Sequence, residues 1–148
     1  MKRQDYTTSI TVNVDPMEVF RHINSVNKWW TENTEGSSEK LNDIFTVNFG
    51  QTFITLKITE SIPGKKIVWN VTDCNKHWLI NKKEWKGTQV IWEISTKASS
   101  TRVDFTHLGL APELECFGVC EKAWNDYLQN SLKNLINKGE GMPETNTG

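Results

Sequence analysis

The chain has 148 residues, and its 17 basic and 18 acidic side chains leave a formal net charge of -1. This length is about that of one ordinary domain, and so balanced a charge argues against a nucleic-acid surface or a polybasic membrane patch. No apolar run approaches the roughly 20 residues of a membrane-spanning helix, and the first residues lack the apolar segment of a signal peptide. Three cysteines cannot all pair within one chain, which disfavours a disulfide-stapled secreted scaffold. We therefore expect a single cytoplasmic domain over residues 1–148.

The first predicted elements are a strand and two short helices. Tyr6 to Val14 alternates apolar and polar residues, which is typical of a strand with one buried face. Asp15 then has the character of a helix N-cap, and Pro16 suits the first helical position. A second short helix is expected to run toward the pair Trp29 and Trp30.

The middle of the chain has the pattern of an antiparallel meander. Residues 31–43 are polar and turn-rich, which predicts a loop or a weak edge strand. Beyond them, apolar and polar residues alternate in segments around 45–49, 54–58, 67–71, 90–94 and 103–107. Strands joined by such short links pair antiparallel and bury one face of their sheet. The stretch 73–86 shows no regular pattern.

The last element is the longest. From about Leu114, apolar residues recur every three or four positions, which predicts a helix about 23 residues long, or roughly 35 Å at 1.5 Å per residue. Gly139 is a natural stop for it. Residues 140–148 are expected to form a flexible tail.

This order of elements predicts an α+β fold in which a curved antiparallel sheet wraps around the long helix and two short helices follow the first strand. A sheet curved around a helix often leaves a hollow that binds apolar ligands. A packed core without a cavity is the alternative. The ligand-binding residues predicted for the hollow are Trp30, Trp69, Trp92, Phe105, His107, Cys120, Trp124 and Tyr127.

Several separated blocks resemble the START-like (SRPBCC) superfamily, and in particular the bacterial relatives of the activator of the heat-shock-protein-90 ATPase. The blocks are Ile10–Phe20 continued to Trp29 and Trp30, Gly87–Val90, Thr101–Leu110, Ala123–Lys133 and Gly139–Pro143. The resemblance covers nearly the whole chain and implies the helix-grip fold. Two departures stand out. Asp73–Trp85 is longer than the usual tight hairpin, and we expect no counterpart of the additional N-terminal domain of the eukaryotic activators.

Two polar side chains are candidates for chemistry in the predicted hollow. His107 is expected to face the hollow, because it lies on the same side of its strand as Val103 and Phe105. An imidazole in that position could orient a polar head group of a ligand or act as a general base. Tyr127, on the helix, offers a hydroxyl group. The alternative is that both are core residues whose polar atoms are hydrogen-bonded inside the protein.

The three cysteines and one histidine form a second candidate cluster. Cys116 and Cys120 are four residues apart, so their sulfur atoms lie one helical turn from each other. Cys74 and His77 lie in the irregular stretch, which the meander brings toward the start of the long helix. Thiolates and imidazoles are zinc ligands. The alternatives are a disulfide from Cys74 to Cys116 or Cys120, and plain packing.

These observations favour a protein that binds a small hydrophobic or aromatic molecule, with no cofactor. The resemblance implies a second reading, a chaperone cofactor or stress-response interaction protein. A third is a cyclase or hydrolase that uses His107 in the same cavity. Trp78 and Trp85 are expected to form a lid, a partner surface or part of the core.

Overall fold

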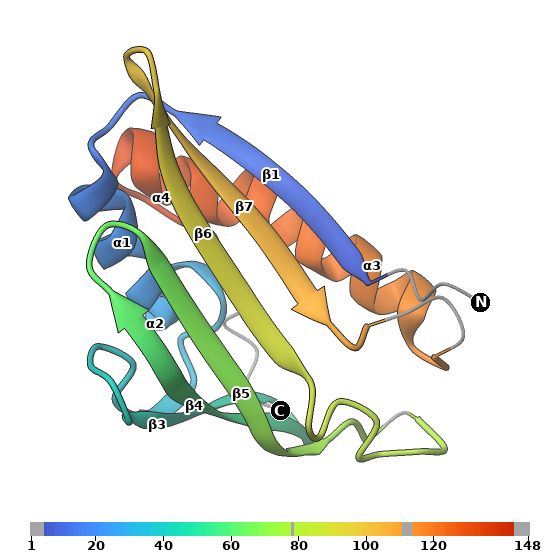
Figure 1. Ribbon diagram of the computed structural model, residues 1–148. Coiled ribbons are helices and arrows are strands. Elements are labelled where there is room, and N and C mark those ends of the chain that lie inside the picture. Colours follow the sequence, from blue (N-terminus) through green and yellow to red (C-terminus); the bar gives the residue numbers. More distant parts are fainter. Residues whose placement is uncertain (1–4, 78, 111–113, 144–148) are drawn as a thin grey trace.

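The computed structural model describes residues 5–77, 79–110 and 114–143, which form one curved sheet and a helical rod across one face of it (Figure 1). Within these residues the sheet has seven strands in the order β1-β7-β6-β5-β4-β3-β2, and every neighbouring pair is antiparallel. The strands are β1 (Tyr6–Val12), β2 (Thr34–Gly36), β3 (Ile44–Phe49), β4 (Thr52–Ile62), β5 (Lys66–Asn75), β6 (Gln89–Lys97) and β7 (Ser100–Leu108).

The helices are α1 (Pro16–Asn24), α2 (Val26–Trp29), α3 (Phe117–Asp126), the π-helical segment η1 (Tyr127–Leu132) and α4 (Lys133–Lys138). The last three are continuous and form the rod, while α1 and α2 follow β1 (Figure 1). This arrangement confirms the predicted α+β helix-grip architecture.

The start of α1 follows the predicted capping pattern. The backbone N–H groups of Met17 and Glu18 donate to Asp15 Oδ1 at 2.8 and 3.1 Å, and Pro16 begins the helix. Such a cap stabilises a helix by about 1 kcal/mol. The preceding strand ends at Val12 rather than at Val14, where it was predicted to end.

Two segments without a clear alternating pattern contain strand residues in the structure. Within the predicted loop 31–43, β2 pairs with β3 as a short edge strand, which is the second of the two predicted outcomes. The irregular stretch 73–86 begins with the end of β5, so Cys74 is a strand residue.

The helical rod differs from the predicted helix at its start and in its middle. It begins at Phe117, three residues after the expected Leu114, and η1 interrupts its α-helical hydrogen bonding. It ends where predicted, because Gly139 adopts the left-handed conformation (φ 82°) and its N–H donates to Leu135 O at 2.9 Å.

The structure describes residues 140–143 of the predicted tail, and they are anchored to the helix pair. Ser131 Oγ donates to Trp29 O at 2.6 Å and accepts from the N–H of Met142 at 2.7 Å. A Cβ atom on Gly141 would collide with Lys28 O, so only glycine permits this close approach. Residues 144–148 lie outside the described part of the chain.

Tryptophan dominates the core between the sheet and the rod. Trp29, Trp69, Trp92 and Trp124 are among its largest fully buried side chains. Burial of one such ring contributes several kcal/mol of hydrophobic free energy. In the described ranges, no helix is both long and apolar enough to cross a bilayer.

Candidate ligand pocket

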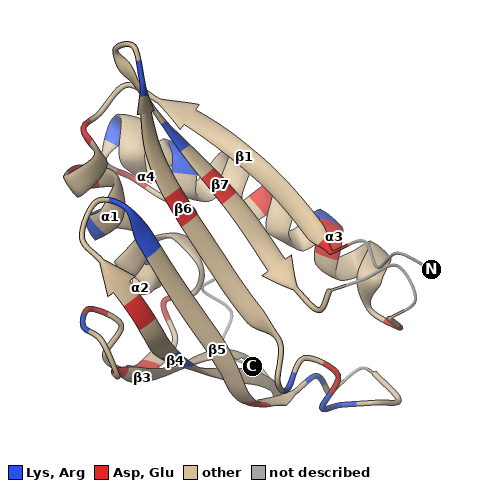
Figure 2. Ribbon diagram, viewed as in Figure 1, with Lys and Arg blue, Asp and Glu red and all other residues tan. Residues whose placement is uncertain are grey.

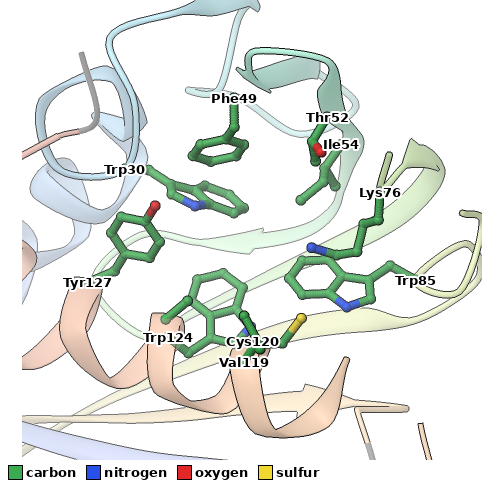
Figure 3. Close-up of a pocket in the computed structure, with 11 residues that line it drawn as sticks. Trp30, Phe49, Thr52, Ile54, Lys76, Trp85, Val119, Cys120, Trp124 and Tyr127 are labelled. Carbon is green, nitrogen blue, oxygen red and sulfur yellow. The ribbon is translucent and has the colours of Figure 1, made fainter. Parts of the chain in front are cut away.

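A pocket of about 280 Å³ lies between the first half of the helical rod and the sheet (Figure 3). The rod contributes its floor, the start of β4 and the end of β3 contribute one wall, and the loop after β5 contributes the other. Its lining residues are Trp30, Phe49, Thr52, Ile54, Lys76, Trp85, Val119, Cys120, Ala123, Trp124 and Tyr127.

Aromatic rings form most of this surface. The ring of Trp124 lies 5.0 Å from that of Trp30 and 5.9 Å from that of Trp85, and the second pair is stacked at an interplanar angle of 8°. Phe49 and Tyr127 face each other at a centroid distance of 6.5 Å. Such surfaces attract apolar and flat aromatic molecules.

The charged group in this apolar setting is Lys76. Its side chain is buried, and Nζ lies 4.0 Å from the centroid of the Trp85 ring, a cation–π contact (Figure 3). Burial lowers the pKa of Lys76 to about 8, although the charges of Cys74 and Glu84 act in the opposite direction. The amine is therefore mostly protonated at pH 7 but poorly hydrated.

Two glutamates join the loop after β5 to the start of α3. The Glu84 carboxylate accepts from the backbone N–H groups of Glu115 and Cys116 at 2.7 and 3.1 Å. In return, the Glu115 carboxylate accepts from the N–H groups of Ile80 and Asn81, the shortest of these bonds being 3.1 Å. This reciprocal pairing fixes the Trp85 wall against the rod.

We expect Glu84→Ala to lower the free energy of unfolding by about 1–2 kcal/mol, because it leaves two N–H groups near a helix start without their charged acceptor. Urea unfolding measures this change, and hydrogen exchange at Glu115 and Cys116 should accelerate. Glu121→Ala, at an exposed position of α3, is the matched control and should change stability by less than about 0.5 kcal/mol. Equal effects of the two substitutions would contradict the pairing.

His107 lies outside the pocket, fully buried behind the ring of Trp124. Trp124 Nε1–H donates to His107 Nδ1 at 3.0 Å, so the ring proton resides on Nε2, which lies 2.9 Å from Thr88 Oγ1. The Thr88 hydroxyl in turn donates to Trp85 O at 2.6 Å. Burial lowers the pKa of His107 to about 3, and the Lys76 charge acts in the same direction. Both ring nitrogens are thus occupied in a neutral structural network, as in the core alternative.

The eight residues predicted to bind ligand divide into two layers. Trp30, Cys120, Trp124 and Tyr127 line the pocket, whereas Trp69, Trp92, Phe105 and His107 lie behind it. The inner layer supports the outer one, since the rings of Phe105 and Trp124 are 4.6 Å apart and those of Trp92 and Phe105 are 4.8 Å apart.

The structure excludes one of the arrangements considered for the cysteines. Cys116 and Cys120 are joined in a disulfide, while Cys74 is free and its thiol donates to Lys82 O at 3.5 Å. The predicted disulfide to Cys74 is therefore wrong. Within the described residues, no group of three or more His, Cys, Asp or Glu side chains could hold a metal ion.

Sequence reasoning missed Lys76, Phe49 and Val119 as lining residues and left the role of Trp85 open. The available signal for Lys76 was its position in a long irregular stretch that also holds a cysteine and tryptophans. Trp78, the other residue expected at a lid or partner surface, lies outside the described residues.

Comparisons with known proteins agree on the fold. No protein-family model matches the chain, and neither does any curated protein. Among solved structures, an Aha1 dimer from Colwellia psychrerythraea is similar with a TM-score of 0.75 at 22% identity, over 93% of this chain and 99% of that one. Protein SSP2350 from Staphylococcus saprophyticus is similar with a TM-score of 0.70 at 13% identity, over 94% of this chain and 96% of that one.

DynU16, a protein in the dynemicin biosynthetic locus, gives a TM-score of 0.66 at 14% identity. The match covers 91% of this chain but 48% of DynU16, so this chain spans about half of that protein. These likenesses agree at the level of architecture: the chain has the helix-grip fold.

Proposed function

We propose that the protein binds a small hydrophobic or aromatic molecule in the pocket between the helical rod and the sheet. The observation that carries this proposal is a pocket of about 280 Å³ walled by three indole rings, a phenyl ring and a tyrosine. Val119, on the rim, is 62% exposed, so one side of the pocket meets solvent.

The size of the pocket limits the ligand. Pockets for drug-sized molecules measure roughly 300–1,000 Å³, and this one lies just below that range. A one- or two-ring aromatic compound or a short aliphatic chain fits such a volume, whereas a two-chain phospholipid does not. Removing these aromatic walls from water supplies the affinity, at about 25 cal/mol per Å² of apolar surface.

Filling the pocket from the rod tests the proposal. Ala123 is the smallest residue of the floor, and Ala123→Phe should place a ring in the ligand space. We expect the neutral dye N-phenyl-1-naphthylamine to bind the wild-type protein and quench its tryptophan fluorescence, with at least tenfold weaker binding to Ala123→Phe. Mass spectrometry of the natively purified protein is the complementary search for a retained ligand.

Asn125→Phe is the matched control, because it adds the same ring at an exposed position of α3 and should leave dye affinity unchanged. Failure of the dye to bind, or equal binding by both variants and the wild type, would overturn the assignment of the pocket as the binding site.

A second candidate function is that of a chaperone cofactor, and the likeness to the Aha1 dimer favours it. The test is stimulation of the ATPase of a bacterial heat-shock-protein-90 homologue. A rate unchanged at large molar excess of this protein would argue against it. The enzymatic alternative through His107 receives no support from geometry, since both ring nitrogens are hydrogen-bonded away from the pocket.

A further inference from the structure

The pocket combines one cationic side chain with walls that are otherwise apolar or neutral. Of the described residues that line it, Lys76 is the one with a charged side chain at neutral pH. Its side chain is 6% exposed, and Figure 3 shows the amine directed over the Trp85 ring toward the space between Ile54 and Trp124. Any molecule that enters this space meets a poorly hydrated ammonium group.

Placing a cation there is costly for the protein by itself. Burial shifts the protonation equilibrium of Lys76 toward the neutral amine. This shift shows that the surroundings of the amine solvate its charged form less well than water does. Cys74 and Glu84 favour the charged form of Lys76, and the Glu84 carboxylate also accepts two backbone N–H groups at the start of α3. In so apolar a pocket, an anionic ligand group close to the ammonium would stabilise it, and a cationic ligand would be repelled.

The loop that carries Lys76 also favours an anionic ligand. Lys82, Lys83 and Lys86 follow Lys76 in the loop after β5, and Figure 2 shows basic residues gathered along this loop. Lys83 pairs with Asp73 at 2.8 Å, while Lys86 is exposed. Basic side chains on the loop that carries Lys76 raise the local concentration of anions.

From these observations we infer that the pocket selects a small aromatic carboxylic acid, whose carboxylate pairs with Lys76 and whose ring lies among Trp30, Trp85 and Trp124. This inference rests on the proposed function, since it names the class of ligand for the same pocket. A carboxylate against a buried ammonium forms charge-assisted hydrogen bonds, which are about twice as strong as neutral ones. The limited volume and the aromatic walls favour a ring over a long acyl chain.

A panel of isosteric probes separates the charge from the ring. We expect 2-naphthoate to bind the wild-type protein at least tenfold more tightly than neutral 2-naphthamide at pH 7, measured by calorimetry and by tryptophan quenching. Cationic 2-naphthylmethylamine should bind more weakly than the amide, and octanoate more weakly than naphthoate. Naphthoate affinity should also fall as the pH rises from 7 to 9 and the amine loses its proton, while amide affinity stays constant.

The variant Lys76→Met retains the length of the side chain but removes its charge. We expect naphthoate to lose its advantage over the amide in this variant, with amide affinity unchanged or improved. Lys86→Met is the matched control from the exposed part of the same loop and should preserve at least a fivefold preference for the acid. The wild-type panel needs no substitution, so it remains decisive if Lys76→Met fails to fold.

The experiments distinguish a failure of the carboxylate selectivity from a failure of the proposed function. Equal binding of naphthoate and naphthamide by the wild-type protein would overturn the carboxylate selectivity and leave hydrophobic binding standing. Tighter binding of octanoate than of naphthoate would overturn the choice of an aromatic acid. If none of the probes nor the neutral dye binds, both the inference and the proposed function are wrong.

Discussion

Replacing Trp124 by alanine should lower the free energy of unfolding by about 3–5 kcal/mol, the range observed when a large core aromatic is truncated. The indole is 2% exposed and lies against the rings of Trp30 and Phe105 at centroid distances of 5.0 and 4.6 Å. Its loss opens a cavity at the floor of the pocket and also removes the donor to His107 Nδ1. Urea unfolding followed by far-ultraviolet circular dichroism measures the change.

Two further substitutions separate these causes. Trp124→Phe retains most of the apolar contact but leaves His107 Nδ1 without its donor, and we expect it to cost about 1–3 kcal/mol. Val119→Ala, on the exposed rim of the same helix, should change stability by less than about 1 kcal/mol. A loss below about 1 kcal/mol for Trp124→Ala would contradict the central position of this ring.

Acidification should destabilise the protein well above the pH range in which carboxylates titrate. The pKa of His107 is lowered to about 3 in the folded protein by burial, while an unfolded chain protonates the same ring near pH 6.5. The unfolded state therefore binds more protons as the pH falls below 6.5. The stability that depends on neutral His107 is complete above that pH and is lost progressively as the pH falls toward 3, by at most about 1.4 kcal/mol per pH unit.

Measured between pH 6.5 and 4.5, this predicts a loss of about 2–3 kcal/mol in the free energy of unfolding. His107→Gln, which cannot titrate, should be less stable at neutral pH but should lose most of this slope. Burial is also the main cause of the lowered pKa of His22, so His22 adds to the acid sensitivity in the same direction. His22→Gln is therefore the matched control for His107→Gln. If His107→Gln retained the full wild-type slope, the buried network would not be the source of the acid sensitivity.

Other groups with shifted pKa values act in a different pH range. Hydrogen bonds from Ser37 to Asp43 and from Lys83 to Asp73 lower the pKa of each carboxyl group below its usual 3.8. Their contribution to stability is lost only as the pH falls below about 4, so it does not overlap the measured interval from pH 6.5 to 4.5.

Periodicity predicted the scaffold well, because burial on one face imposes a repeat that can be read along the chain. The cap at Asp15, the antiparallel meander, and the stop at Gly139 all depend on local chemistry or on that repeat. The π-helical segment η1 was missed, because one extra residue in a turn alters the apolar pattern too little to be distinguished from ordinary variation.

The candidate site was predicted less completely. The alternating pattern predicts which side chains face the interior, but it does not predict whether a side chain lines the pocket or packs behind it. Trp69 and Trp124 both face the interior, yet the first is packed behind the pocket and the second forms its floor. Lys76 was missed for a different reason, since a lysine in an irregular polar stretch is typical of a solvated loop. Only the fold of that stretch against α3 shows that its amine is buried.

The π-helical turn at Tyr127–Leu132 divides the rod into two halves that serve different neighbours. α3 presents its side chains to the pocket, whereas α4 contacts α1 and β1. A residue in an α-helix turns the chain by about 100°. A π-helical turn holds one more residue than an α-helical turn. Rewinding Tyr127–Leu132 as an α-helix with the same number of residues would therefore rotate α4 by about 100° about the rod axis relative to α3, so the wide turn sets the orientation in which α4 meets α1 and β1.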